Sequence, residues 1–162
     1  MANDKIKVAV IPGSFDPITV GHLDVIERAA GMFEHVYVTA LQNADKKGMF
    51  SSEEKLEMMR LATKHLSNVT VCIDDGLTAV FAAEHDACLV KGVRNASDFD
   101  YEMGLAQISR AIDKRVDTIL LPARAEYMHI SSSYVREMLR YGHEFHDAVP
   151  PAVYAYLKEL HK

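Results

Sequence analysis

Five short apolar runs recur along the chain and are separated by segments in which hydrophobic residues are spaced differently. The runs are KVAVIP (7–12), HVYVTAL (35–41), NVTVCI (68–73), ACLVKG (87–92) and DTILLP (117–122). Each run is nearly continuous and rich in Val, Ile or Leu, which is typical of strands covered on both faces. The pattern therefore predicts five buried strands.

Helical spacing takes over between the first three runs. Two apolar faces follow this spacing, the first made of Leu23, Ile26, Ala30 and Phe33 and the second of Leu56, Met59, Ala62 and Leu66. Ser51 and Glu54 precede the second face at the spacing of a capping box, in which each side chain bonds the backbone N–H of the other. These two segments are predicted to be amphipathic helices.

The second half of the chain shows three more helical segments. The stretch 97–113 is predicted to be a long helix, with Ser97 as its N-cap. SSSYVREMLRY ends at Gly142, a residue suited to a helix C-terminus. The last segment places Val153, Tyr156, Leu157 and Leu160 on one stripe.

This alternation of strands and helices predicts the fold class. Strands joined through helices form parallel sheets with right-handed crossovers. We therefore expect an α/β, Rossmann-like, doubly wound sheet of five parallel strands, with helices on both faces and a helical C-terminus. No repeat or long linker divides the chain, so a single domain over residues 1–162 is expected. A ligand would bind at the carboxyl ends of the strands.

Composition narrows the classes of partner. The 162 residues are 49% hydrophobic and carry a formal net charge of −5. An acidic protein lacks the charge that drives broad binding to nucleic acids or anionic membranes, and no apolar stretch approaches the ~18 residues of a membrane span. Cys72 and Cys88 lie inside apolar runs, which suits buried thiols in a reducing compartment. We expect a cytoplasmic protein with neither a nucleic-acid nor a membrane partner.

The turn after the first strand, VIPGSFDPITVGHLDVI, holds the most informative chemistry. Pro12, Gly13, Pro17 and Gly21 shape a long loop where a ligand of such a sheet would lie. His22 stands near the start of a helix, whose free N–H groups and dipole favour a phosphate and should lower the imidazole pKa. An isolated histidine at this place more commonly just begins a helix.

Two segments carry a resemblance to a known family. Thr19, Val20, Gly21 and His22 resemble the TxGH signature of the nucleotidyltransferase superfamily, and Ile130, Ser131, Ser132, Ser133 and Arg136 resemble its ISxxxxR signature. Three serines that open a helix also offer hydroxyls and N–H groups to a phosphate. From PGSFDPITVGH to VPPAVYAYL, the chain resembles the phosphopantetheine adenylyltransferase family.

The resemblance implies a reaction and an assembly. The family joins the adenylyl group of ATP to 4′-phosphopantetheine and releases pyrophosphate, with Mg²⁺ and without a covalent enzyme intermediate. No metal site made of protein side chains is expected, because the phosphates of ATP would supply most of the ligands of Mg²⁺. The family forms homohexamers built as dimers of trimers, and the resemblance implies the same here.

The resemblance also implies residue roles. His22, Lys46 and Arg94 would be catalytic, through the α-phosphate, the acceptor phosphate and the β- and γ-phosphates respectively. Ser14, Lys46, Thr78 and Lys91 would bind 4′-phosphopantetheine. The remaining contacts to ATP would come from Ser14, Phe15, Gly92, Val93, Glu102, Tyr127, Met128, His129, Ile130, Ser131, Ser132 and Ser133.

Several of these residues also have a plainer interpretation. Lys46 could be a solvated loop lysine, Arg94 a surface cation and Glu102 a solvated helix flank. The chain also departs from the family pattern at Lys91, where many relatives have Arg, and at Ser109, where many have Asn. Lysine keeps the charge but loses the bidentate fork.

Two other functions remain as alternatives. The chain could transfer a nucleotide to nicotinamide mononucleotide or to a glycerol phosphate, although such relatives usually place His at the position of Thr19 or carry a different second signature. It could also be a non-catalytic ATP-binding module, because a Rossmann-like frame does not specify catalysis.

Overall fold

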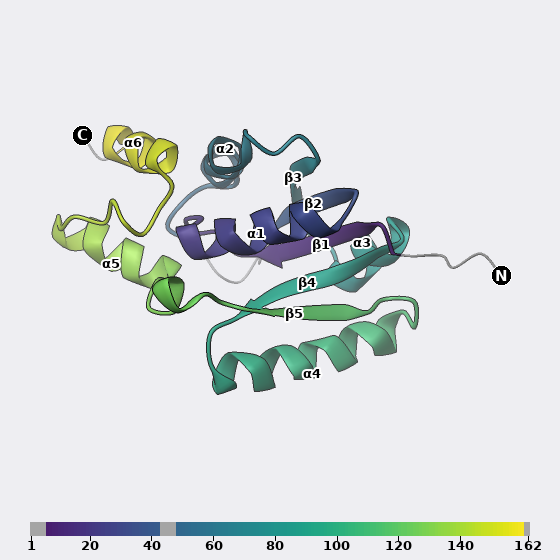
Figure 1. Ribbon diagram of the computed structural model, residues 1–162. Coiled ribbons are helices and arrows are strands. Elements are labelled where there is room, and N and C mark those ends of the chain that lie inside the picture. Colours follow the sequence, from purple (N-terminus) through teal and green to yellow (C-terminus); the bar gives the residue numbers. More distant parts are fainter. Residues whose placement is uncertain (1–5, 43–47, 161–162) are drawn as a thin grey trace.

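The computed structural model describes residues 6–42 and 48–160. Its centre is a single sheet of five parallel strands in the order β3-β2-β1-β4-β5 (Figure 1). The strands are β1 (Val8–Gly13), β2 (His35–Leu41), β3 (Val69–Asp74), β4 (Ala87–Val93) and β5 (Thr118–Pro122). All five predicted strands are confirmed, with ends that differ by at most one residue.

Six α-helices within the described residues surround this sheet. They are α1 (Val20–Met32), α2 (Ser52–Thr63), α3 (Thr78–Glu84), α4 (Ala96–Ile112), α5 (Ser132–Tyr141) and α6 (Pro151–Leu160), with a short 3₁₀ turn, η1 (Ala125–Tyr127). The doubly wound α/β prediction is therefore confirmed. Helix α3 was not predicted from the sequence, because seven residues make only about two turns and show no clear helical period.

Helix ends follow from local hydrogen bonds. The Ser51–Glu54 capping box is confirmed: Ser51 N–H donates to Glu54 Oε2 at 2.7 Å, and Glu54 N–H donates to Ser51 Oγ at 3.2 Å. The prediction of Ser97 as the N-cap of α4 is wrong, because Asn95 has the extended backbone and its Oδ1 accepts from Asp98 N–H at 2.9 Å. Gly142 ends α5 with a left-handed φ of 68°, as expected of that residue type.

Two hydrophobic cores lie on opposite faces of the sheet. Alternate residues of β1 point to opposite sides, so Ala9 and Ile11 belong to the larger core and Val10 to the smaller one. The larger core is closed by residues of α1, α2, α5 and α6, and the smaller one by α3. Val153 and Leu157 of α6 are fully buried, whereas Leu160 at the end of the predicted stripe is 42% exposed.

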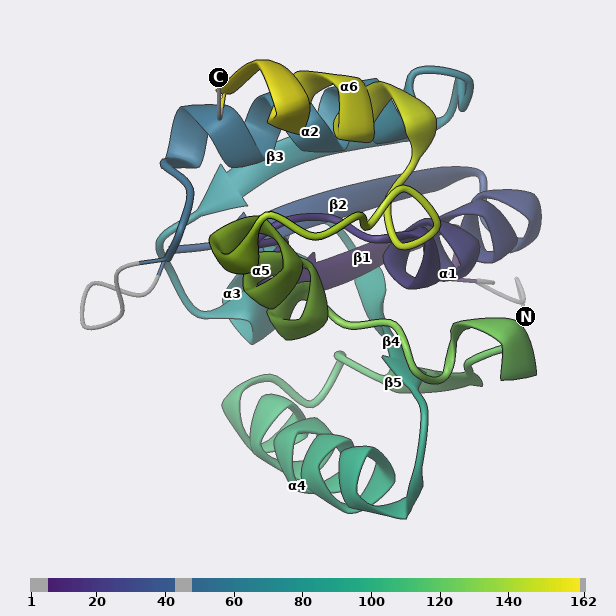
Figure 2. The same cartoon turned by 90° about the vertical axis from the view of Figure 1, so that its left-hand side faces the viewer.

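The strand order decides where a ligand can bind. After β1 the chain turns through α1 to β2 on one side, and β4 pairs with β1 on the other, so the loops leaving β1 and β4 diverge. Helix α5 lies beyond the carboxyl ends of these strands (Figure 2). None of the helices in the described parts of the chain is long and apolar enough to cross a membrane.

Candidate active site

A cavity of about 450 Å³ opens where the loops after β1 and β4 diverge. Its volume is within the range of small-molecule sites, about 300–1,000 Å³. The sequence-predicted residues that line it are Ser14, Phe15, His22, Lys91, Gly92, Arg94, Glu102, Tyr127, Ile130, Ser131, Ser132 and Ser133. Thus the structure brings most of the predicted ATP-binding residues to one place.

Four of the predicted site residues that the structure describes do not line this cavity. Val93 is buried at the end of β4, and Met128 and His129 are exposed; none of the three is among the described residues that line the cavity. Thr78 lines a second, neighbouring cavity. Lys46 lies outside the described residues.

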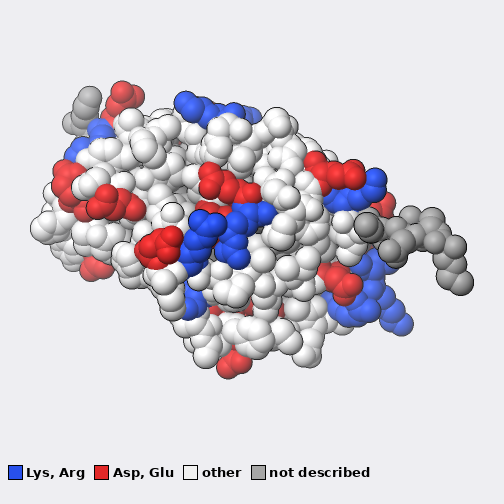
Figure 3. Space-filling model, in the orientation of Figure 1, with Lys and Arg blue, Asp and Glu red and all other residues white. Residues whose placement is uncertain are grey.

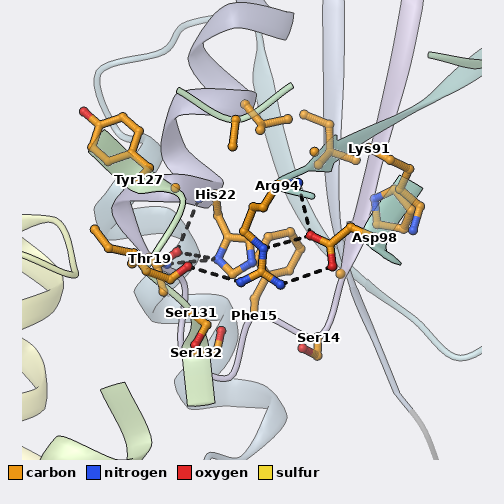
Figure 4. A pocket seen from close by; sticks show the side chains of 18 of the residues that line it. Ser14, Phe15, Thr19, His22, Lys91, Arg94, Asp98, Tyr127, Ser131 and Ser132 are labelled. Carbon is orange, nitrogen blue, oxygen red and sulfur yellow. Dashed lines mark hydrogen bonds and ion pairs between the residues drawn. The ribbon is translucent and has the colours of Figure 1, made fainter. Parts of the chain in front are cut away.

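The TxGH segment is a helix cap in which histidine takes the usual place of glutamate. Thr19 is the N-cap of α1; its N–H donates to Nδ1 of His22 at 3.0 Å, and the His22 N–H donates back to Thr19 Oγ1 at 3.3 Å (Figure 4). The prediction that His22 stands near a helix start is confirmed, and it occupies the third helical position. This cap sets the orientation of the imidazole ring.

The electrostatics of His22 follow from this position. Burial, with a smaller contribution from the nearby positive charge of Arg94, lowers the pKa of His22 to about 4. The ring is therefore neutral near pH 7, and because Nδ1 accepts from Thr19, Nε2 carries the proton. The buried ring of Phe15 packs edge-to-face with the imidazole, with 5.1 Å between the ring centroids. The backbone of Phe15 has an uncommon positive φ of 43°. His22 thus gives the cavity a fixed, uncharged N–H donor.

A second group in the cavity, Arg94, is held by a residue that the sequence analysis did not select. Asp98 Oδ2 accepts from Arg94 Nε at 2.9 Å and from the Arg94 backbone N–H at 3.1 Å, and Arg94 Nη1 donates to the carbonyl of Ile130 at 3.4 Å (Figure 4). Hydrogen bonding to Arg94 lowers the pKa of Asp98. The four-residue spacing across the start of a helix was the available sequence signal for this pair.

Lys91 and Glu102 form a nearly buried ion pair. Lys91 Nζ lies 3.0 Å from Glu102 Oε2 and 3.2 Å from Oε1, and their side chains are 17% and 15% exposed. The interpretation of Glu102 as a solvated flank is therefore wrong. The two side chains line both the first cavity and the second one, so the pair stands between them.

The second cavity, of about 240 Å³, has a mainly hydrophobic wall. Apart from Lys91 and Glu102, its lining residues are Pro12, Leu41, Leu77, Thr78, Ala79, Leu89, Leu105, Ala106, Ile108, Ser109, Ile112 and Thr118. Both Thr78 and Ser109 are therefore at this cavity. Its position next to Lys91 suits an apolar group attached to an anion.

The three serines of the second signature mainly hold the site together. Ser131 is the N-cap of α5 and accepts from Tyr134 N–H at 3.1 Å. Ser132 Oγ donates to the carbonyl of Pro17 at 2.8 Å, and Ser133 Oγ accepts from Arg136 Nη2 at 2.9 Å. Because these hydroxyls already form hydrogen bonds within the protein, a phosphate at this end of α5 would bind mainly to the backbone N–H groups of the first turn.

Gly92 has a packing reason to be glycine. A Cβ at this position would lie 2.9 Å from Cγ2 of Val25 on α1. A side chain would therefore require Val25 to shift, and because Val25 also lines the cavity, the shift would disturb the cavity wall.

Metal ligands are scarce in this part of the molecule. Within residues 6–42 and 48–160, no three His, Cys, Asp or Glu side chains are grouped so that they could hold a metal ion. The cavity carboxylates of Asp98 and Glu102 are engaged by Arg94 and Lys91. The described lining is thus suited to an anionic ligand.

Comparisons with known proteins agree with this geometry. Residues 10–138 match the model of a family described as cytidylyltransferase-like. The chain is 47% identical over 152 residues to a phosphopantetheine adenylyltransferase of Symbiobacterium thermophilum, an alignment that covers 93% of this chain and 94% of the relative.

A solved structure shares the fold at much lower identity. It is the crystal structure of a Vibrio parahaemolyticus protein provisionally named nicotinate-nucleotide adenylyltransferase. The TM-score is 0.74 with 19% identity, over 97% of this chain and 94% of the other. At this identity, the similarity speaks for the fold alone.

Proposed function

Because the chain belongs to the cytidylyltransferase-like family and, within it, to the phosphopantetheine adenylyltransferases, we propose that its two neighbouring cavities receive the two substrates of that reaction. The enzyme transfers the adenylyl group of ATP to 4′-phosphopantetheine, and the products are 3′-dephospho-coenzyme A and pyrophosphate. This reaction is a step of coenzyme A biosynthesis.

One observation carries the assignment of the cavities. The two signature segments are more than a hundred residues apart in sequence, yet both line the first cavity, and Ser132 is bonded to Pro17 across a separation of 115 residues. This cavity is the proposed ATP site. The second cavity, with its mainly hydrophobic wall, is the proposed site of the pantetheine arm. Lys91 stands between them and would meet the acceptor phosphate.

The proposed chemistry is an in-line displacement. A phosphate oxygen of the acceptor attacks the α-phosphorus of ATP; the new O–P bond forms as the bond to the β-phosphate oxygen breaks, and pyrophosphate leaves with the electron pair. His22 would donate its Nε2–H to a non-bridging α-phosphate oxygen as negative charge develops there. The acceptor phosphate is already mostly ionised near neutral pH, so no general base is required.

Cations and positioning groups would supply the rest. Arg94, oriented by Asp98, would hold the β- and γ-phosphates. Ser14, which lines the cavity after β1, would contact the acceptor phosphate, and Lys46 would neutralise it. The contribution of the protein is then mainly orientation and charge stabilisation.

Mg²⁺ fits this arrangement as a partner of ATP. The carboxylates of Asp98 and Glu102 are paired with Arg94 and Lys91, so the phosphate oxygens of ATP and water are the suitable ligands for the ion. When bound, the ion would neutralise phosphate charge and favour the departure of pyrophosphate.

Pyrophosphate release tests the function directly. The purified protein is given ATP and Mg²⁺ with 4′-phosphopantetheine, nicotinamide mononucleotide or glycerol 3-phosphate. We expect release only with 4′-phosphopantetheine. Release with another acceptor instead would contradict the substrate, whereas ATP binding without release would favour a non-catalytic module.

We also propose that the enzyme works as a homohexamer in the cytoplasm. None of the residues of α4, all of which the structure describes, is buried, and five of its large hydrophobic residues are at least 39% exposed: Phe99, Tyr101, Met103, Ile108 and Ile112. The surface over α4 shows few charged side chains on the face seen in Figure 3. An apolar surface of this kind is typical of an interface between subunits. The free thiols of Cys72 and Cys88 are compatible with a reducing compartment.

A further inference from the structure

Asp16, in the loop between β1 and α1, lies where three distant segments of the chain meet. The residue is 6% exposed, yet it is not among the described residues that line either cavity. Its neighbours Phe15 and Ser14 do line the first cavity. A buried carboxylate is costly unless it is fully paired, so its partners indicate what it does.

The first partners come from the segment that precedes α2. Asp16 Oδ2 accepts from Met49 N–H at 2.9 Å, and Oδ1 accepts from Phe50 N–H at 3.0 Å. The approach is close: a Cβ on Gly48 would lie 2.8 Å from Asp16 Oδ1 and 2.7 Å from Nζ of Lys55. Lys55 itself lies 3.5 Å from Oδ1. Asp16 therefore anchors this segment to the loop that carries Ser14.

The other partner comes from α5. Arg136 Nη1 donates to the backbone carbonyl of Asp16 at 2.7 Å and lies 3.7 Å from the carboxylate oxygen Oδ2. Arg136 also donates to Ser133 Oγ. The N-terminus of α5, where the proposed ATP site ends, is thus tied to the same residue.

We propose that Asp16 is a positioning residue: it holds the acceptor side of the site at a fixed position relative to the ATP side. This inference rests on the proposed function, in which Ser14 meets the acceptor phosphate and the start of α5 meets ATP. Asp16 acts through these groups and does not touch the substrates.

Only aspartate satisfies all the partners that meet at position 16. Two separate N–H groups bond to two separate oxygens, and the negative charge faces Lys55 and Arg136. Asparagine has the same shape, but it offers one oxygen, and its NH₂ group would face an N–H donor or a cation. Asp16→Asn therefore weakens the contacts of this carboxylate with the segment before α2 and with Lys55 and Arg136, with little change in side-chain volume.

Steady-state kinetics with each substrate varied in turn test the proposal, with Asp24→Asn as the matched control. Asp24 is 5% exposed and is also paired with two cations, Arg28 and Arg124, each at 3.1 Å. We expect Asp16→Asn to lower kcat/KM for 4′-phosphopantetheine by about 10–100-fold, since a displacement of about 1 Å can cost about 100-fold in rate. The Kd of ATP alone should change far less. Asp24→Asn should leave kcat/KM for the acceptor near the wild-type value.

Amide hydrogen exchange supplies a readout that does not depend on turnover. The amides of Met49 and Phe50 should exchange faster in Asp16→Asn and at the wild-type rate in Asp24→Asn. Should Asp16→Asn fail to fold, Lys55→Gln, which removes one partner, should shift both measurements in the same direction by less.

The proposal is overturned if the two aspartate variants lower acceptor kcat/KM equally, or if exchange at Met49 and Phe50 is unchanged. A wild-type protein without turnover of 4′-phosphopantetheine would contradict the proposed function instead, and the exchange rates would still decide the role of Asp16.

Discussion

At the scale of single residues, the imidazole of His22 contributes both to a helix cap and to the cavity lining. His22 completes the cap of α1 through Nδ1 and lines the cavity beside Arg94. The first task fixes the tautomer that the second one needs, because a nitrogen that accepts from Thr19 cannot carry the proton. Arg94 is controlled in a similar way by Asp98, whose hydrogen bonds hold the guanidinium in the cavity.

Replacement of His22 by Ala should reduce kcat strongly. The loss of one donor to a transition-state oxyanion typically costs about 100–1,000-fold in rate. Because the donor acts mainly as charge develops, the Kd of ATP should change little. Pyrophosphate release and calorimetric ATP binding check this expectation, and a variant with near-normal kcat would show that His22 has no such role.

The lowered pKa of His22 also predicts a pH dependence of stability. The unfolded chain binds a proton near the ordinary pKa of 6.5, whereas the folded protein does so only at about 4. Between these values the unfolded state binds more protons, so the unfolding free energy falls as pH drops from 6.5 to 4, by on the order of 1–3 kcal/mol. Urea denaturation at several pH values should show this loss in wild type and lack this component in His22→Ala.

Asp98→Asn should raise the KM of ATP by about tenfold, the equivalent of one charge-assisted hydrogen bond of about 1.5 kcal/mol. Arg94 would remain, but its guanidinium would no longer be held by a carboxylate. Asp113→Asn is the control, because Asp113 makes the same kind of pair with Arg115 through bonds of 3.1 and 2.8 Å, outside the lining of either cavity. Equal effects of the two variants on KM would contradict a role in orientation.

At the scale of elements, helix ends decide where site residues lie. The cap of α1 places His22, the cap of α5 places the serines, and the cap of α4 at Asn95 places Asp98 within reach of Arg94. In each case a side chain in extended backbone bonds to an N–H in the first turn. A shift of one of these caps would move a cavity residue around its helix.

The correction of the α4 cap can be tested. Asn95→Ala should lower the unfolding free energy by about 1 kcal/mol, because the Asp98 N–H would lose its acceptor. Ser97→Ala should change it by less than about 0.5 kcal/mol, since that residue lies in the first turn and alanine is a good helix former. Urea denaturation of both variants distinguishes the two positions, and a larger effect of Ser97→Ala would contradict the assignment of Asn95.

At the scale of the whole molecule, the sheet separates a large core from a small one, and α4 contributes to neither. The helix lies along the β5 edge of the sheet, as both views show (Figures 1 and 2). Five of its large hydrophobic residues are exposed. Since Ile108 and Ile112 also line the second cavity, assembly on this face would lie next to the proposed acceptor site.

Met103→Glu should therefore shift the protein from the proposed hexamer toward smaller species. A charge on an apolar interface must be desolvated when the subunits associate. Met32→Glu is the control, because Met32 ends α1 and is 56% exposed, compared with 39% for Met103. Sedimentation velocity measures both masses; a wild-type monomer, or dissociation by both variants, would contradict the proposed assembly face.

Local interactions explain what the sequence could predict alone. Strand positions, the Ser51 capping box, the glycine end of α5 and the two signature segments depend on residues within a few positions of one another. Hydrophobic period, cap chemistry and turn residues express such interactions directly. The short helix α3 was not predicted, because two turns are too short to show a helical period. The cap of α4 was assigned to Ser97 because serine is common at N-caps, whereas the structure shows that Asn95 makes the capping bond.

Tertiary structure decided the rest. The order of the strands, the pairing of Lys91 with Glu102 and the contact of Arg136 with Asp16 across 120 residues have no local signal. Such contacts form only when packing of the core closes long loops and brings the carboxyl ends of β1 and β4 together. The sequence determined which elements and which chemical groups this protein has, and burial of the apolar faces determined which of those groups share a cavity.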